Sequence, residues 1–338
     1  MILAKNNFAV ALSALTVFLA IFPFVFTSPY LLGVMVIIGI TSIVVMGLGL
    51  LMGYAGQISL GHAAFYGLGA YVSAILSATY QVNPWLAIVI AAAATGILAY
   101  ILGRPILKLQ EHYLALATLG LGLIIHSVFV EESEITGGPS GMSLPYLKIA
   151  GIVLNNDFKF YFLVWGVALV VLVMAHNIIN SRVGRALKSI HGSEFAAGSL
   201  GIDTARYKIQ VFTLSAVLAS IAGSLYAHYV SFISPSPFDL MVSVQFLLMA
   251  VAGGLHSLWG PLVGVATITV LREVLRSLIP LFLPEAGGEY EIIVFGLILM
   301  VMMIFLPEGL TSLFKKIIRP TGLLSRERGV LHEHSGGP

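Results

Sequence analysis

Apolar runs of about the length needed to cross a bilayer recur along most of the chain. A spanning helix needs roughly 20 predominantly apolar residues. Of the 338 residues, 58% are hydrophobic and only 9% are charged, a balance that excludes an ordinary soluble domain. The sequence therefore predicts an all-α integral membrane protein, a polytopic bundle of about 8–10 transmembrane helices within residues 1–320. The clearest runs are residues 8–26, 30–52, 84–103, 113–130, 160–179, 209–233, 240–271 and 292–306.

One segment inside this apolar sequence is unusually polar. Residues 53–71 carry five glycines together with a glutamine, a serine and a histidine. Because unpaired backbone groups are costly in hydrocarbon, an irregular segment at membrane depth must be buried in protein or line a wet cavity. Interrupted helices of this kind commonly surround the solute site of transporters. The segment predicts a broken helix on a translocation path, with candidate residues Gly56, Gln57, Ser59, Gly61 and His62.

A second segment, residues 253–264, repeats this pattern in the other half of the chain. Gly254 is followed by two residues, then by Ser257-Leu, and after one further residue by Gly260, as Gly56 is followed by Ser59-Leu and Gly61. Internal repeats with interrupted helices are typical of transporters, so Gly254, Ser257 and Gly260 join the candidate path. The alternative for any single glycine is close packing between spanning helices. For His62 the alternative is an interior histidine with its hydrogen bonds satisfied.

The polar connection at residues 131–158 is acidic and rich in turn residues. Glu131, Glu132 and Glu134 precede the sequence Thr-Gly-Gly-Pro-Ser-Gly at residues 136–141. Because Lys and Arg favour the cytoplasmic side, a connection with few of them is predicted to be extracytoplasmic. Such turn chemistry forms either a tight surface loop or a loop that contacts solute. The candidate residues for solute contact are Thr136, Gly137, Gly138 and Gly141.

The polar segment at residues 181–208 is basic and is therefore predicted to be cytoplasmic. Its apolar residues suit a short amphipathic helix with a break, too short for a domain but long enough to dock one. Residues 321–338 are expected to form a disordered cytoplasmic tail. Arg272, Glu273 and Arg276 near the end of an apolar run leave the number of spans between residues 240 and 290 open, and a count of ten spans places them at the outer face.

Several function classes find no support in the sequence. The net charge of +2, with cations near helix ends, does not indicate nucleic-acid binding. The chain has no cysteine, and its nine histidines show no metal-binding spacing, so no metal site is predicted. No catalytic constellation is present, and we expect no enzymatic activity. Without a phosphate-binding Gly-x-x-x-x-Gly-Lys loop, we expect no cofactor on this chain and energy supplied by a partner or an ion gradient.

Five ordered motifs, beginning at Gly53, Thr136, Ser181, Glu194 and Gly253, together resemble the branched-chain amino acid ABC transporter permeases, most closely the LivM-type subunit. The resemblance covers nearly the whole chain. It implies an importer of leucine, isoleucine and valine in a bacterial or archaeal plasma membrane. The implied partners are a homologous LivH-type permease, two ATPase subunits that bind the ATP, and an extracytoplasmic solute-binding protein.

The resemblance also implies that the basic cytoplasmic segment couples this chain to the ATPase. In the family a loop with Glu, two alanines and Gly docks into that subunit, and Glu194, Ala197 and Gly201 match it here. Phe195, between the glutamate and the alanines, departs from the simplest form of the motif. The candidate coupling residues are Arg182, Gly184, Arg185, Glu194, Ala197 and Gly201.

Three alternatives to this function remain open from the sequence. The same type of importer is compatible with urea, other amino acids or small carboxylates, because solute choice in such systems resembles a property of the binding protein. An ion-coupled secondary carrier would act without an ATPase. A membrane-embedded enzyme is the third alternative, and no group of residues in the sequence supports it.

Overall fold

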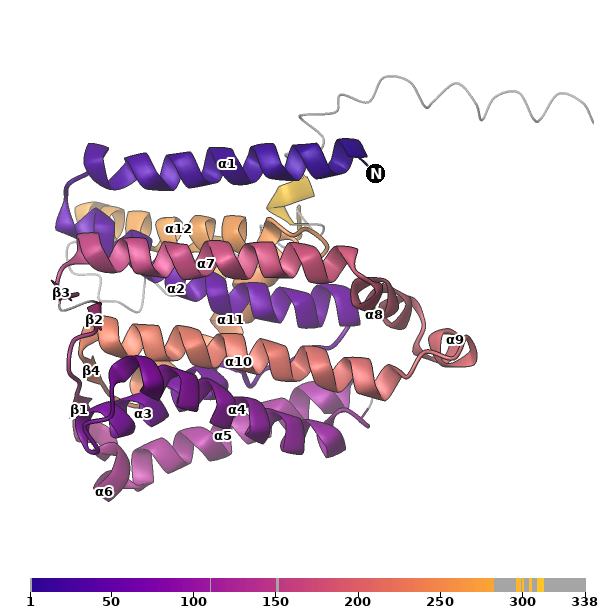
Figure 1. Ribbon diagram of the computed structural model, residues 1–338, viewed down its shortest axis with the longest axis horizontal. Coiled ribbons are helices and arrows are strands. Elements are labelled where there is room, and N and C mark those ends of the chain that lie inside the picture. The colour runs from indigo at the N-terminus through magenta and orange to yellow at the C-terminus, as the bar shows by residue number, and fades with distance from the viewer. Residues whose placement is uncertain are drawn as a thin grey trace, which may run out of the picture.

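The long helices lie side by side and form a single bundle (Figure 1). The computed structural model describes residues 2–109, 111–149, 152–282, 296–298, 300, 304–305 and 309–312. The expected disordered tail at residues 321–338 lies outside the described residues. Two short helices, α8 and α9, lie beyond one end of the bundle, and short strands lie at the other. We call these the α8–α9 end and the strand end.

Six of the described helices are long and apolar enough to cross a membrane. They are α1 (Ile2–Val25), α2 (Pro29–Gly49) with its π-helical continuation η1 (Leu50–Tyr54), α4 (Pro84–Ile106), α5 (Glu111–Glu131), α7 (Asp157–Asn180) and α10 (Thr204–Val230). Two shorter helices, α3 (His62–Ala78) and α11 (Leu240–Gly253), each adjoin one of the polar glycine segments, and α12 (Gly260–Phe282) follows the second. This arrangement confirms the predicted all-α membrane bundle with interrupted helices.

Polar side chains fix where several helices begin. Asn83 accepts a hydrogen bond from the Trp85 amide, with Pro84 in the first turn of α4. Asp203 does the same for the Arg206 amide at the start of α10, and Asp239 for the Val242 amide at the start of α11. Because the first amides of a helix have no partner within it, these caps fix where α4, α10 and α11 begin.

The core of the bundle is formed where α10 packs against α3 and α4, and where α2 packs against α7. At the crossing of α3 and α10 the two backbones touch. A Cβ atom at Gly223 would collide with the Tyr66 carbonyl oxygen, and one at Gly69 would collide with that of Ser220. Small residues that allow such close approach are a common means of joining membrane helices, so these two glycines serve packing.

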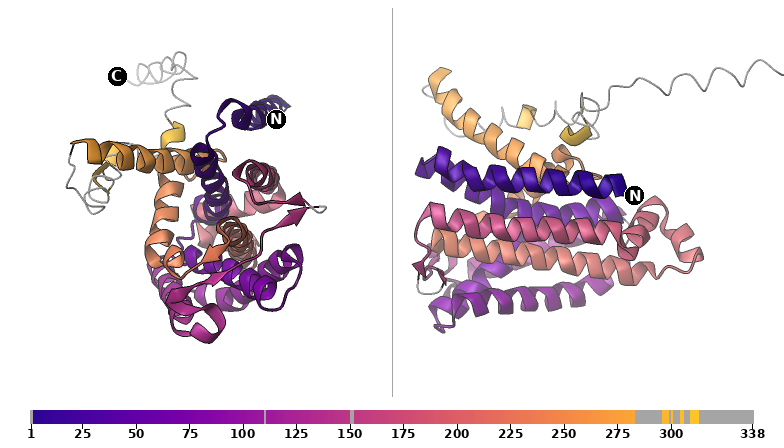
Figure 2. Two further views of the ribbon diagram at one scale, coloured as in Figure 1. Left: turned by 90° about the vertical axis from the view of Figure 1, so that its left-hand side faces the viewer. Right: turned by 45° about the horizontal axis from the view of Figure 1, so that its top comes forward.

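The strand end holds the connection at residues 131–158. It contains α6 (Ser133–Thr136), η2 (Gly138–Ser140), β1 (Met142–Ser143), β2 (Lys148–Ile149) and β3 (Ile152–Val153). Strand β1 pairs antiparallel with β4 (Phe232–Ile233), which precedes η3 (Ser236–Phe238), and β2 pairs with β3. Figure 2 shows α8 (Arg182–Gly192) and α9 (Glu194–Ser199) projecting from the opposite end. The acidic and basic connections thus lie at opposite ends of the bundle, as opposite sides of a membrane require.

The charged residues of α12 lie at the strand end. The Tyr30 hydroxyl, at the start of α2, donates a hydrogen bond to the Glu273 carboxylate. Nearby, the Tyr229 hydroxyl donates to Asp157 at 2.8 Å, and all four side chains line one hollow. Since α12 starts at the second glycine segment inside the bundle, α11 and α12 enter the bundle and return toward the same end. This places Glu273 at the end predicted to be extracytoplasmic.

Candidate translocation path and coupling segment

Both predicted helix breaks are present in the structure. Residues 53–61, which comprise the end of η1 and the segment between η1 and α3, are called break 1; residues 254–259 separate α11 from α12 and are called break 2. Gly56 and Gly254 lie in these breaks with φ angles of 68° and 106°, which side chains other than glycine rarely permit. The repeat seen in the sequence therefore marks two equivalent turns in two different helices.

The two breaks touch each other within the bundle. A Cβ atom at Gly53 would collide with the Leu255 carbonyl oxygen. His256 Nδ1 lies 3.1 Å from the Gly53 carbonyl oxygen, and the Tyr54 hydroxyl lies 3.5 Å from the His256 carbonyl oxygen. The end of η1 and break 2 therefore form one continuous contact between the two halves of the chain.

His62 and Ser59 are fully engaged inside the protein. The His62 ring is buried, with Nδ1 3.0 Å from the Ser59 hydroxyl and Nε2 2.6 Å from the Ser215 hydroxyl of α10. The Thr118 side chain of α5 accepts a hydrogen bond from the Leu60 amide, and a Cβ atom at Gly61 would lie 2.6 Å from the Thr118 carbonyl oxygen. These contacts fix break 1 to its neighbours. They agree with the alternative that His62 is an interior histidine with its hydrogen bonds satisfied.

A cavity of about 820 Å³ opens beside break 1 and reaches α8 and α9. Gln57 lines it and is 3% exposed, yet neither its side-chain oxygen nor its nitrogen has a hydrogen-bond partner among the described residues. A buried amide left unpaired costs free energy, so a polar ligand or water that reached this amide from the cavity would be favoured. The wall also includes Met52, Ala55, Gly56, Ile58, Leu109, Leu114, Ile190, His191, Gly192, Ser193, Glu194, Lys208, Leu247, Val251 and Leu255.

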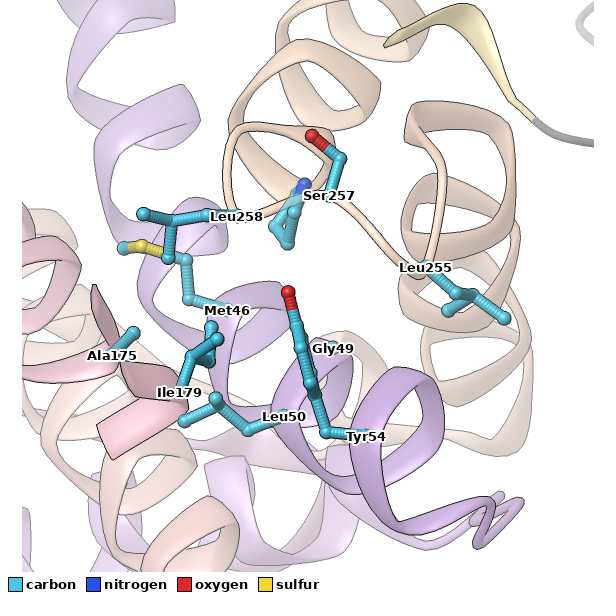
Figure 3. Close-up of a pocket in the computed structure, with 10 residues that line it drawn as sticks. Met46, Gly49, Leu50, Tyr54, Ala175, Ile179, Leu255, Ser257 and Leu258 are labelled. Carbon is cyan, nitrogen blue, oxygen red and sulfur yellow. The ribbon is translucent and has the colours of Figure 1, made fainter. Parts of the chain in front are cut away.

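The space beside break 2 is far smaller, at about 10 Å³ (Figure 3). That is close to the smallest volume that holds one water molecule. In Figure 3 the Tyr54 hydroxyl points toward the loop that carries Ser257, whereas the Ser257 hydroxyl points away from Tyr54. A Cβ atom at Gly260 would collide with the Gly254 carbonyl oxygen. Ser257 and Leu258 therefore border a space too small for solute in this conformation, whereas Leu255 of the same break lines the large cavity. Gly254 and Gly260 pack closely against each other.

The candidate path residues thus fall into two groups. Gly56 and Gln57 line the large cavity, while Ser59, Gly61, His62, Gly254, Ser257 and Gly260 do not line it. The wall contributed by His191, Glu194 and Lys208 was not assigned to the path from the sequence. The sequence placed these residues only in the predicted coupling segment. That this segment lies against break 1 cannot be read from sequence spacing.

The turn sequence at the strand end forms a compact loop. The Thr136 hydroxyl donates to the carbonyl oxygens of Phe129 and Glu132 and accepts from the Gly138 amide. Gly137, Gly138 and Gly141 all have positive φ angles, and a Cβ atom at Gly141 would collide with the Ile233 carbonyl oxygen. Thr136, Gly137, Gly138 and Gly141 shape a tight turn against β4. This geometry agrees with the alternative of a tight surface loop.

The predicted coupling segment is built as two capped helices. Ser181 accepts hydrogen bonds from the amides of Val183 and Gly184 at the start of α8, and Ser193 from that of Ala196 at the start of α9. A Cβ atom at Gly184 would collide with the Ile179 carbonyl oxygen, so glycine allows the sharp turn from α7. After α9 the chain turns at Gly201, where the φ angle is 81°.

The six coupling candidates differ in exposure. Glu194 pairs with Lys208, which is only 9% exposed, and Ala197 is buried. Arg182 and Arg185 are exposed to solvent. Two apolar side chains of the segment are highly exposed: Phe195 at 87% and Leu200 at 81%. Phe195 lies in the first turn of α9 and Leu200 directly follows its last residue, in the part of the chain that projects beyond the bundle (Figure 1). We call these two exposed side chains the apolar tip.

Comparison with known proteins agrees with this architecture. A family model described as the permease component of branched-chain amino acid transport systems matches residues 30–305. The chain is 31% identical over 261 residues to the high-affinity branched-chain amino acid transport system permease protein LivM of Escherichia coli and to that of Salmonella typhimurium. Each match covers 70% of this chain but 59% of the relative, less than two thirds of its length. The permease protein LivH of Escherichia coli is 25% identical over 232 residues, which are 66% of this chain and 71% of LivH.

Proposed function

Because the chain belongs to the family of branched-chain amino acid transport permease components, we propose that it is the membrane-spanning subunit of an ATP-driven importer of leucine, isoleucine and valine. It is a multi-pass protein of the plasma membrane. Its proposed partners are a LivH-type permease, two ATPase subunits and an extracytoplasmic solute-binding protein. The chain itself binds no cofactor under this proposal, because ATP is bound by the ATPase subunits.

The observation that carries the proposal is the cavity with Gln57 at its wall. A free amino acid is a zwitterion, and a primary amide offers both a donor for the carboxylate and an acceptor for the ammonium group. Leu114, Leu247 and Val251 provide an apolar surface for a branched aliphatic side chain. The volume of about 820 Å³ is within the usual range for a small-molecule site.

The same cavity also supports the coupling of transport to ATP hydrolysis. Residues 190–194, which form the junction of α8 and α9, line it directly. An apolar tip on a short projecting helix fits a groove on a partner subunit, because the binding energy of an interface is concentrated in a few buried anchors. We assign this role to Phe195 and Leu200. Movement of that tip would then alter the wall of the cavity.

Purification of the complex tests the proposed function. The tagged chain should recover a LivH-type permease and ATPase subunits, and proteoliposomes with the loaded binding protein should take up labelled leucine only when ATP is present inside. Uptake by this chain alone, driven by an ion gradient, would instead establish a secondary carrier. Uptake of urea or a small carboxylate with no leucine uptake would keep the importer and change its solute.

Replacing Gln57 with leucine should lower leucine uptake by about tenfold or more, because a hydrogen bond to a charged group contributes about 1.5–3 kcal/mol. Leucine has a similar size and removes both polar atoms, so the complex should still assemble. The matched control is Ser42→Ala. Ser42 in α2 is also buried, its hydroxyl has no partner among the described residues, and it does not line the cavity. Undiminished uptake by Gln57→Leu would show that solute does not bind this amide.

A further inference from the structure

His191, in the last turn of α8, lies between the two breaks. A Cβ atom at Gly56 would lie 2.7 Å from His191 Nδ1, so the ring occupies space that only glycine leaves free. On the other side, the ring centre lies 5.3 Å from that of His256, with the two planes inclined at 71°. One side chain of the coupling segment therefore contacts break 1 and break 2 at once.

The contact with break 2 is itself tied to break 1. His256 Nδ1 lies 3.1 Å from the Gly53 carbonyl oxygen, so a displacement of the His256 ring strains the end of η1. One turn earlier in α8, Lys188 places its Nζ atom 5.6 Å from the centre of the Tyr54 ring, also in η1. Lys188 and His191 are three residues apart and so share one face of α8. That face of α8 therefore contacts both break 1 and break 2.

We propose that His191 is the positioning residue that transmits movement of α8 and α9 to both breaks. This inference rests on the proposed function, in which the ATPase moves the apolar tip. Only Ser193 separates α8 from α9, so a displaced tip shifts the last turn of α8. His191 also lines the cavity beside Gln57. Its movement would therefore change the cavity wall and the packing of break 2 together, and such packed contacts switch between discrete arrangements.

The first test measures ATP hydrolysis and leucine uptake by the complete complex with His191→Ala. The ratio of leucine transported to ATP hydrolysed should fall by about two- to thirtyfold, the range found for residues that carry coupling between sites. Assembly and basal hydrolysis should persist. The control is His176→Ala near the end of α7, whose ring stacks on Phe8 at 3.5 Å and does not line the cavity. An unchanged ratio for His191→Ala would overturn the inference.

A second test uses the absence of cysteine from the sequence. A chain with both His191→Cys and His256→Cys should be joined by a short thiol-reactive cross-linker in the assembled complex. Cross-linking should stop the remaining uptake of this variant, and cleavage of a reducible linker should return uptake to the variant's own level before cross-linking. This pair decides the question if His191→Ala fails to assemble. Full uptake by the cross-linked complex would show that the contact does not need to move.

The outcomes separate this inference from the proposed function. A wild-type complex without ATP-driven leucine uptake would overturn the proposed function and the inference with it. A wild-type complex that couples normally, beside a His191→Ala complex that couples equally well, would overturn the inference alone. In the double variant His191→Ala with His256→Ala, the loss of coupling should be smaller than the sum of the losses in the two single variants, because both changes remove the contact between the two rings.

Discussion

Replacing Phe195 with aspartate should prevent stable association with the ATPase subunits. Phe195 is 87% exposed in the apolar tip, and an aromatic anchor of this kind carries much of the energy of an interface when it is buried. Truncating such an anchor costs about 2 kcal/mol or more, which is roughly a thirtyfold loss of affinity. A carboxylate adds the cost of burying an unpaired charge. The expected result is loss of ATPase subunits from the purified complex.

The measurement is the amount of ATPase that co-purifies with the tagged chain, together with ATP hydrolysis by the eluate. Because Phe195 is exposed in the chain itself, its replacement should leave the thermal stability of the isolated chain unchanged. Tyr80→Asp is the matched control, since Tyr80 is 69% exposed but follows α3 at the strand end. It should retain the ATPase. Normal co-purification by Phe195→Asp would show that the apolar tip is not the anchor.

Glu194 shows why motif matching alone assigns coupling roles incompletely. The sequence matches it to the residue that docks in related permeases, and it marks Phe195 as a departure from the motif. In the structure Glu194 pairs with Lys208 of α10, while the neighbouring Phe195 side chain is 87% exposed. The charge therefore holds the segment in place and the aromatic ring is free for a partner. A pairing with a residue on the next helix is not visible from a motif.

The glycine-rich segments illustrate what the sequence does predict. Polar residues and glycines inside apolar runs require an interruption protected from lipid, and both breaks occur where these residues stand. Which side chains face the cavity was not predictable. His62 bonds to Ser215, 153 residues away in the chain, and does not line the cavity. Gln57, five positions earlier, has no such partner among the residues that the structure describes, and that difference depends on packing.

Replacing Gly53 with alanine should destabilise the chain by about 3 kcal/mol, at the upper end of the cost of overpacking. In an ordinary helix the same change stabilises by about 0.5–1 kcal/mol, because glycine loses more conformational entropy on folding. Here the added Cβ atom would collide with the Leu255 carbonyl oxygen. That atom belongs to the backbone and cannot turn aside as a flexible side chain would. The steric cost therefore exceeds the gain in helix propensity.

Thermal unfolding of the purified chain in detergent measures this effect. Gly120→Ala in α5 is the matched control, because a Cβ atom at Gly120 meets nothing within 4 Å, and its unfolding temperature should stay equal or rise. Equal unfolding temperatures for the two variants would show that breaks 1 and 2 can separate without cost. A lower unfolding temperature for Gly53→Ala would show that the contact between η1 and break 2 holds the two halves of the chain together. Transport would then require His191 to act on a junction that also stabilises the fold.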